Sequence, residues 1–123
     1  MAHNIRIDAE RGVVRVAITG AFETESMPRI AAAAREVAAA NGFPLLYDVR
    51  GATPGDVRRQ DVFWLPRTVP ALRATGAGRL RVAMVYTGED CPIVQFWETV
   101  CRNVGLQVRA FTDEALALAW LAP

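Results

Sequence analysis

The chain opens with two short segments in which apolar and polar residues alternate. Ile5 and Ile7 alternate with charged neighbours, and after a turn at Gly12 the same two-residue period runs through residues 14–18. Alternation places every second side chain on one face, which is typical of half-buried strands. The pattern therefore predicts an antiparallel hairpin at the start of the chain.

Helical spacing follows the hairpin. Between residues 27 and 38 apolar side chains recur every three or four positions. Ser26 comes just before this segment, and Pro28 is its second residue. Serine is a favoured N-cap, proline is tolerated in a first turn, and glycine suits the left-handed position after a helix. We predict a helix that Ser26 caps and Gly42 ends.

Two apolar runs further along indicate inner strands. The first covers residues 45–49, and the second, residues 80–86, is apolar along most of its length. A strand that is apolar nearly throughout is covered on both faces of its sheet. These two strands therefore belong in the middle, and the alternating segments belong at the edges.

The last third of the chain predicts a helix, an edge strand and a final helix. Asp90 is the expected cap of the first helix, and Gly105 closes it. Residues 106–110 then alternate as an edge strand does, and Thr112 is the expected cap of the last helix.

The complete order is β-β-α-β-α-β-α-β-α. Strands that alternate with helices are joined by right-handed crossovers and form a largely parallel sheet. We expect an α/β fold with a mixed, mainly parallel five-stranded sheet and about four helices. With 123 residues and no linker of low complexity, residues 1–123 are expected to form a single domain.

Charge and composition exclude several classes of partner. The formal net charge is only +1, so no overall field would gather nucleic acid or an anionic membrane surface. No apolar run approaches the roughly 20 residues that span a bilayer, so we expect no integral membrane segment and a cytoplasmic location. Cys91 and Cys101 are expected to be free thiols, since a full apolar core needs no disulfide.

Candidate chemistry lies where the parallel strands end, because open α/β sheets bind ligands at that edge. The loop expected after residue 49 offers Arg50, Thr53 and Asp56. A hydroxyl nucleophile needs a base, yet the sole histidine, His3, is expected before the first strand. One histidine and two distant cysteines also make no usual zinc site. We expect no catalytic residue, no metal and no cofactor, and hence no enzyme; an enzyme would have to act through Arg50 and the carboxylates of this edge.

The two middle helices differ in how they distribute apolar side chains. From residue 93 to residue 104 they fall in one arc, which predicts that Phe96, Trp97, Cys101 and Val104 are buried or nearly so. This clean segregation makes Cys101 a small core residue and not a nucleophile.

In the helix before it, Val62, Leu65, Val69 and Leu72 form a narrow core stripe. Two large aromatic residues, Phe63 and Trp64, project away from that stripe, as anchors of interfaces do.

Two prolines leave the outward direction of these rings open. Pro66 and Pro70 both disturb helical hydrogen bonding, so the segment can instead be two short pieces with offset faces. In that arrangement Phe63 or Trp64 would turn inward.

Two stretches of sequence carry a family resemblance. They are Tyr47-Asp48-Val49-Arg50-Gly51-Ala52, with Leu65-Pro66-Arg67 in the next helix, and the segment from Phe96-Trp97-Glu98 to Ala119-Trp120-Leu121. With the order of elements, they make the chain similar to the STAS, or SpoIIAA-like, superfamily, over nearly its whole length. Within it, the chain looks like the bacterial STAS/SEC14-like branch of small proteins. The resemblance implies a SpoIIAA-like fold and a regulatory module, since the superfamily contains anti-sigma-factor antagonists.

The phosphorylation site of the antagonists does not carry over. In those members the loop after this strand ends in an Asp-Ser pair whose serine is phosphorylated by a partner kinase. Laid on this chain, Asp56 matches the aspartate and Val57 stands where the serine would be. The resemblance therefore implies a module that lacks the phosphorylatable serine.

We hypothesise a non-catalytic regulatory or protein-interaction module of STAS type. Its contact surface would join the loop of residues 50–56, with Arg50, Thr53 and Asp56, to an outer helical face. That face would carry the two aromatic rings and one guanidinium, and it would bind a protein partner or a second copy: Phe63, Trp64 and Arg67.

The alternative is a carrier or sensor of a small, lipid-like apolar ligand, which the distant likeness to lipid-binding SEC14-like domains permits. Its groove would lie between the sheet and the second and third helices, lined by Phe63, Trp64, Phe96 and Trp97. Rings buried against another chain would favour assembly, whereas rings that line a concave apolar pocket would favour a ligand.

Overall fold

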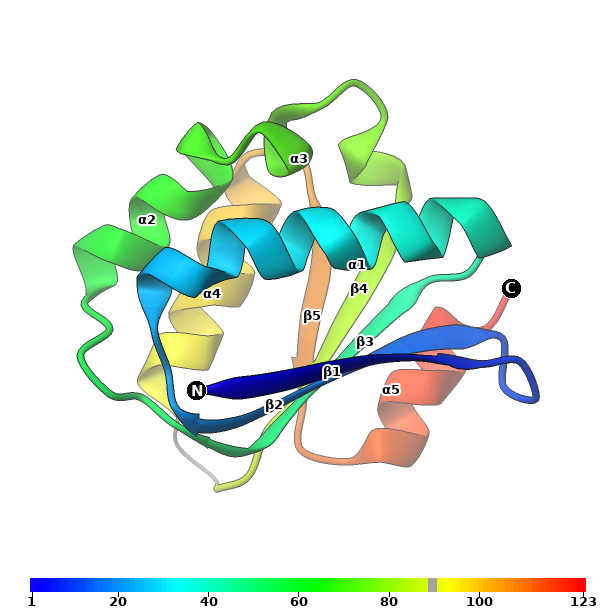
Figure 1. The fold of residues 1–123 in the computed structure, drawn as a ribbon, viewed down its shortest axis with the longest axis horizontal. Helices are drawn as coiled ribbons and strands as arrows, with labels where there is room; N and C mark the ends of the chain where they lie inside the picture. Colours follow the sequence, from blue (N-terminus) through cyan, green and yellow to red (C-terminus); the bar gives the residue numbers. More distant parts are fainter. Residues whose placement is uncertain (89–90) are drawn as a thin grey trace.

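The computed structural model describes residues 1–88 and 91–123, and their main feature is one mixed sheet with helices on both faces (Figure 1). Short 3-10 turns, Thr24–Ser26 and Ala77–Arg79, precede α1 and β4. Within the described ranges, no helix is both long and apolar enough to cross a lipid bilayer. In chain order the main elements are β1 (Ala2–Asp8), β2 (Val13–Ala21), α1 (Met27–Asn41), β3 (Leu45–Thr53), α2 (Arg59–Thr68), α3 (Pro70–Arg73), β4 (Arg81–Val85), α4 (Pro92–Asn103), β5 (Gln107–Phe111) and α5 (Glu114–Leu121).

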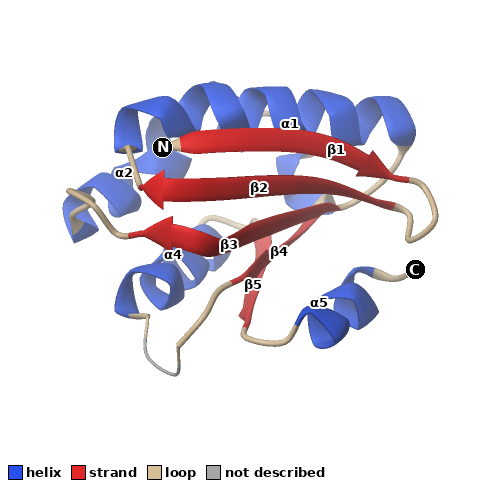
Figure 2. Cartoon of the chain, turned by 60° about the horizontal axis from the view of Figure 1, so that its bottom comes forward, coloured by secondary structure: helices blue, strands red, loops and turns tan. Residues whose placement is uncertain are grey.

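The strands lie side by side in chain order, from β1 to β5 (Figure 2). Among the described residues, β1 alone runs antiparallel to its neighbour, and the other three pairings are parallel. The predicted α/β fold with a mixed, mainly parallel five-stranded sheet is confirmed. Of the predicted hairpin, however, only β1 is an edge strand, because β2 pairs with β3 on its other side.

The third strand is longer than its apolar run predicts. Pairing with β2 continues through Thr19 opposite Gly51 and Ala21 opposite Thr53, beyond an irregularity in the register. Arg50 and Thr53 are therefore strand residues and not members of a loop, because backbone pairing with a neighbour, rather than side-chain polarity, sets where the strand ends. His3 is likewise inside β1, opposite Ile18, and not before the first strand.

Two apolar cores lie on opposite faces of the sheet. The larger one fills the space between the sheet and helices α1 to α4, and the smaller one is closed by α5. Neighbouring residues of β3 divide between them: Tyr47 belongs to the larger core and Leu46 to the smaller one. Side-chain alternation along β3 therefore decides which helices each residue can meet.

The end caps of two helices differ from the prediction. Ser26 has helical backbone angles and makes no side-chain cap bond with α1; its hydroxyl donates to Glu23 Oε2 at 3.2 Å. At α5 the cap is Asp113 and not Thr112, since Asp113 Oδ1 accepts the Ala115 N–H at 2.8 Å. Asp90, the predicted cap of the third helix, lies outside the described residues.

The helix with two prolines is divided, as the open alternative allowed. Its two pieces, α2 and α3, meet at Val69, which has extended backbone angles. The four predicted core residues are nevertheless all buried: Val62, Leu65, Val69 and Leu72.

Burial along α4 follows the helical-wheel prediction except at the end of the helix. Cys101 is fully buried, as predicted, and Phe96 and Trp97 are half-buried. Val104, predicted to be buried, is 39% exposed. It follows the last helical residue with non-helical backbone angles, so the helical wheel no longer describes its direction.

Candidate functional site

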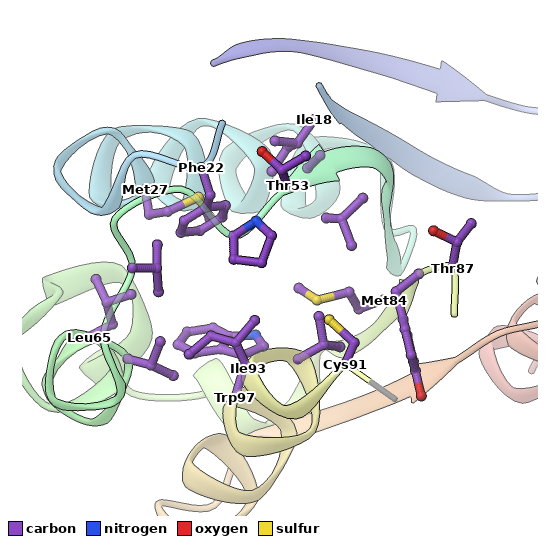
Figure 3. Close-up of a pocket in the computed structure, with 17 residues that line it drawn as sticks. Ile18, Phe22, Met27, Thr53, Leu65, Met84, Thr87, Cys91, Ile93 and Trp97 are labelled. Atoms are coloured by element: carbon purple, nitrogen blue, oxygen red, sulfur yellow. The ribbon is translucent and has the colours of Figure 1, made fainter. Parts of the chain in front are cut away.

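An apolar cavity of about 100 Å³ lies at the carboxyl ends of β3 and β4 (Figure 3). The sheet forms one side, and the first residue of α1, the inner face of α2 and the start of α4 form the others. Thr53 and Thr87, both exposed residues, supply hydroxyl groups among its lining. The apolar wall includes one residue or more from each of these elements: Ile18, Met27, Val49, Leu65, Met84 and Trp97.

A smaller cavity of about 30 Å³ adjoins the first. Four side chains line both, namely Met27, Leu65, Met84 and Trp97. The smaller cavity also meets residues nearer the amino-terminal ends of the parallel strands, including Leu45, Val82 and Val108. The two spaces therefore follow one another along the sheet.

Polar groups of the smaller cavity come from three elements. Arg35 of α1 is half-buried, and its Nη1 donates to the Ala77 carbonyl oxygen at 3.2 Å. Burial raises the pKa of Tyr47, on β3, to about 12, and burial also raises the pKa of the Cys101 thiol on α4. At neutral pH the phenol and the thiol are thus uncharged, while the guanidinium remains a cation.

Arg50 lies on the other face of the sheet from this cavity. Its Nε and Nη2 donate to the two carboxylate oxygens of Asp48, each at 2.9 Å, and Nη2 also donates to Glu114 Oε1 at 3.1 Å. Glu114 is the first residue of α5, which covers the smaller core. The structure therefore separates Arg50 from the α2 face with which sequence reasoning grouped it.

Of the remaining residues predicted on the sheet rim, only one meets the cavity. Thr53 is part of its lining, whereas Asp56 is exposed in the turn before α2 and is absent from the wall. The neighbouring Val57, which stands where the STAS serine would be, is half-buried and lines the cavity. A side chain at this position thus faces an apolar space.

The aromatic pair of α2 faces outward. Phe63 is 36% exposed and Trp64 is 56% exposed, and their rings meet edge to face at 5.2 Å between centroids. Arg67, one turn on, places its guanidinium carbon 3.8 Å from the Phe63 ring centre and donates to the Phe63 carbonyl oxygen at 2.8 Å. These three residues form one surface group, which we call the α2 outer face.

Only one of the four rings predicted to line an apolar groove does so. Trp97 is in the wall of both cavities. Phe63 and Trp64 lie on the opposite side of α2, and Phe96 packs under Arg59, whose guanidinium carbon is 5.4 Å from the ring centre. For those three rings the prediction was wrong. Phe63 and Trp64 point to solvent from the outer side of α2, and Phe96 is covered by Arg59 and not by the cavity.

Sequence reasoning missed Arg35. It stands four residues after Ala31 and three before Ala38, both buried, so it occupies the core-facing stripe of α1. A charged residue on such a stripe was the available signal. The methionines of the wall, Met27 and Met84, carried no comparable signal, since buried methionine is ordinary core composition.

Comparison with known proteins bears on the fold. No protein-family model matches the chain, and no curated protein matches it. A solved structure that resembles it is an uncharacterized protein of the DUF3478 family with a SpoIIAA-like fold from Shewanella loihica PV-4. The likeness covers 98% of this chain and 93% of that one, with a TM-score of 0.53 and 22% sequence identity. At this identity the match establishes architecture: the chain has a SpoIIAA-like fold.

Proposed function

We propose that this protein is a non-catalytic, STAS-type module that senses or carries a small apolar ligand in the larger cavity. The observation that carries the proposal is the position of an apolar cavity at the carboxyl ends of the parallel strands. Open α/β sheets bind ligands at that edge, and ligand sites are mostly apolar concavities. A dry cavity of roughly 150 Å³ binds benzene in another protein. At about 100 Å³ the present cavity is smaller, so it suits a very small apolar group or one end of a longer ligand.

The residues around the cavity support binding rather than catalysis. The candidate nucleophiles in its wall include the hydroxyls of Thr53 and Thr87 and the thiol of Cys91, and each needs an activating neighbour to become reactive. His3, the only histidine, is exposed on the edge strand β1. With Val57 in the wall, phosphorylation at the STAS position is not part of the proposal. We keep the cytoplasm as the proposed location.

A substitution that fills the cavity tests the proposal. We expect the wild-type protein, labelled with ¹³C at its methionine methyl groups, to shift its Met27 and Met84 signals when 1-octanol is added. Val57→Trp should abolish these shifts, because the larger ring occupies the cavity. Val104→Trp is the matched control, since Val104 is exposed and outside the wall, and it should behave as wild type. Unmoved signals in the wild type would overturn the proposal.

The α2 outer face favours a second function, which is binding of a protein partner or of another copy. Two neighbouring exposed aromatic residues with an arginine stacked on one of them are the residue types that dominate interface energies. Of the contact surface proposed from sequence, Phe63, Trp64 and Arg67 remain in this proposal. Arg50 is left out, because its guanidinium is engaged on the other face of the sheet.

The two functions share one helix. Val62 and Leu65 of α2 line the cavity, while Phe63 and Trp64 present the outer face. A ligand that displaces α2 on entering would therefore also move the exposed rings. A ligand shifts the equilibrium between two positions of α2 only if its affinities for them differ. Ligand and partner would therefore strengthen each other's binding if both prefer the same position of α2.

A further inference from the structure

We infer that the ligand of this protein is an amphipathic carboxylate, whose aliphatic chain occupies the larger cavity and whose charged end is held by Arg35 and Tyr47. The inference rests on the proposed function, because it names the chemistry of the ligand that the cavity would bind. The observation behind it is the guanidinium of Arg35 in the wall of the smaller cavity, which has no part in the α2 outer face.

Arg35 is a cation without an anionic partner among the residues that the structure describes. Its one recorded hydrogen bond runs to a neutral acceptor, the Ala77 carbonyl, and no ion pair of the described residues includes it. A guanidinium carries five N–H donors, and partial burial of a charge is unfavourable unless it is paired. An anion brought into the smaller cavity would supply that pairing.

The groups around Arg35 add donors and no negative charge. Tyr47 and Cys101 line the same cavity, and burial keeps both protonated at neutral pH. Trp97 adds an indole N–H, and the other residues of that wall are apolar. A phenol O–H beside a guanidinium suits a carboxylate, which accepts hydrogen bonds at both oxygens and takes arginine in a bidentate geometry.

The volume of the smaller cavity favours a compact charged group. A space of about 30 Å³ is small, and a planar carboxylate has fewer atoms than a tetrahedral phosphate and so fits it better. The larger cavity, of about 100 Å³, then takes the apolar part of the molecule.

The path between the two cavities follows β3. Tyr47 lines the smaller cavity and Val49 the larger one, two residues apart on the same face of the strand and hence about 7 Å apart. The shared wall includes Met27 and Met84, whose unbranched side chains change conformation more easily than other apolar ones. An unbranched chain can therefore pass between them.

The test compares two probes of equal chain length, octanoate and 1-octanol, at neutral pH. Binding is measured from the ¹³C-methyl signals of Met27 and Met84, with Met1, outside both walls, as internal reference. We expect the wild type to bind octanoate about tenfold or more tightly than 1-octanol, because a charge-assisted hydrogen bond adds to the same apolar contact. Equal affinities would overturn the inference.

Substitutions assign the preference to a residue. Arg35→Gln should abolish the preference for octanoate and lower the affinity for 1-octanol far less than that for octanoate. Arg35→Lys should keep part of the preference, because lysine retains the charge without the planar fork of donors. Arg29→Gln is the matched control, since it removes one exposed cation from the same helix and should retain the preference. A preference that survives Arg35→Gln would overturn the assignment.

A second variant and the neutral probe keep the outcomes separate. If Arg35→Gln fails to fold, Tyr47→Phe removes one donor and should weaken octanoate binding several-fold, and 1-octanol binding much less. An unchanged octanoate affinity would contradict the inference. Binding of 1-octanol with no preference for octanoate would leave the proposed function standing and overturn only the carboxylate. If neither probe binds the wild type, the proposed function fails as well.

Discussion

At the scale of single residues, a network of four charged side chains lies on the α5 face of the sheet: Arg15, Asp48, Arg50 and Glu114. Arg15 donates to both carboxylate oxygens of Glu114, at 3.0 and 3.2 Å, and Arg50 does the same to Asp48. Arg50 also reaches Glu114, so one carboxylate joins β2, β3 and the start of α5. The Arg50 guanidinium, which made this residue a candidate for binding, thus forms hydrogen bonds that hold α5 to the sheet.

Because of this network, the stability of the fold should depend on pH in the acid range. Hydrogen bonds from Arg15 hold the pKa of Glu114 below its ordinary value, and hydrogen bonds from Arg50 do the same for the pKa of Asp48. A carboxyl with a lowered folded-state pKa contributes its full stability above the unfolded-state value and loses it as pH falls through the folded-state value. Stability should therefore decline below about pH 4.5.

We expect Glu114→Gln to lower the free energy of unfolding at neutral pH by about 1 kcal/mol, since the paired groups are partly exposed. The free energy of unfolding of the variant should also fall less steeply than that of the wild type as the pH is lowered into the acid range. Urea unfolding at a series of pH values measures both effects. Glu36→Gln, at an exposed position of α1, is the control and should follow the wild type. Parallel acid profiles for Glu114→Gln and wild type would contradict the prediction.

At the scale of elements, α2 has two faces with different roles. Val62 and Leu65 are 4% and 8% exposed and close the cavity, while Phe63 and Trp64 face solvent. Pro66 is accommodated inside α2, and the helix breaks at Val69, just before Pro70. Because the break comes after the aromatic pair, it does not turn either ring inward.

Polar substitutions on α2 separate these faces. Phe63→Ser and Trp64→Ser should each change the free energy of unfolding by less than about 1 kcal/mol, since both rings remain exposed in the folded chain. Leu65→Ala, on the inner face of the same helix, should cost about 2 to 5 kcal/mol. Chemical denaturation of the three variants gives the comparison. A loss of several kcal/mol from Trp64→Ser would place that ring in the core.

At the scale of the whole molecule, the larger core is incompletely filled at one end of the sheet. Helices α1, α2 and α4 converge on β3 and β4 without closing the space between them. A ligand bound there would stabilise the folded chain by mass action, and a partner on the α2 outer face would change its assembly state.

Native mass spectrometry of protein purified from its own host measures both consequences together. We expect a mass above that of the bare chain, from a retained small molecule, and a dimer mass if the α2 outer face binds a second copy. Val57→Trp should lose the small molecule and keep any dimer, whereas Trp64→Ser should do the reverse. A bare monomer at high concentration would contradict the retained ligand and the self-association together.

The order of elements follows from local patterns, and so the sequence determines it. Alternation in the first hairpin, helical spacing over α1 and the apolar runs of β3 and β4 are short-range signals, and the elements that they predict are observed in a mainly parallel five-stranded sheet. The same signals wrongly placed β2 at an edge, because they do not encode its pairing with β3. The burial of Val62, Leu65 and Cys101 follows from periodicity in the same way. Caps are less well determined, since Asp113 and Thr112 are both residue types that cap helices, and the backbone geometry selects Asp113.

The tertiary structure alone decided the partners of Arg50, the role of Arg35 and the position of the cavity. Arg50 meets Glu114 across 64 positions of sequence, and no local pattern encodes such a pairing. The cavity exists because helices far apart in the chain pack imperfectly against the sheet and leave a space between them. Such a space is not encoded by any single residue or local pattern of the sequence. The sequence by itself thus determined the elements and the fold, while the candidate site arose from how those elements pack.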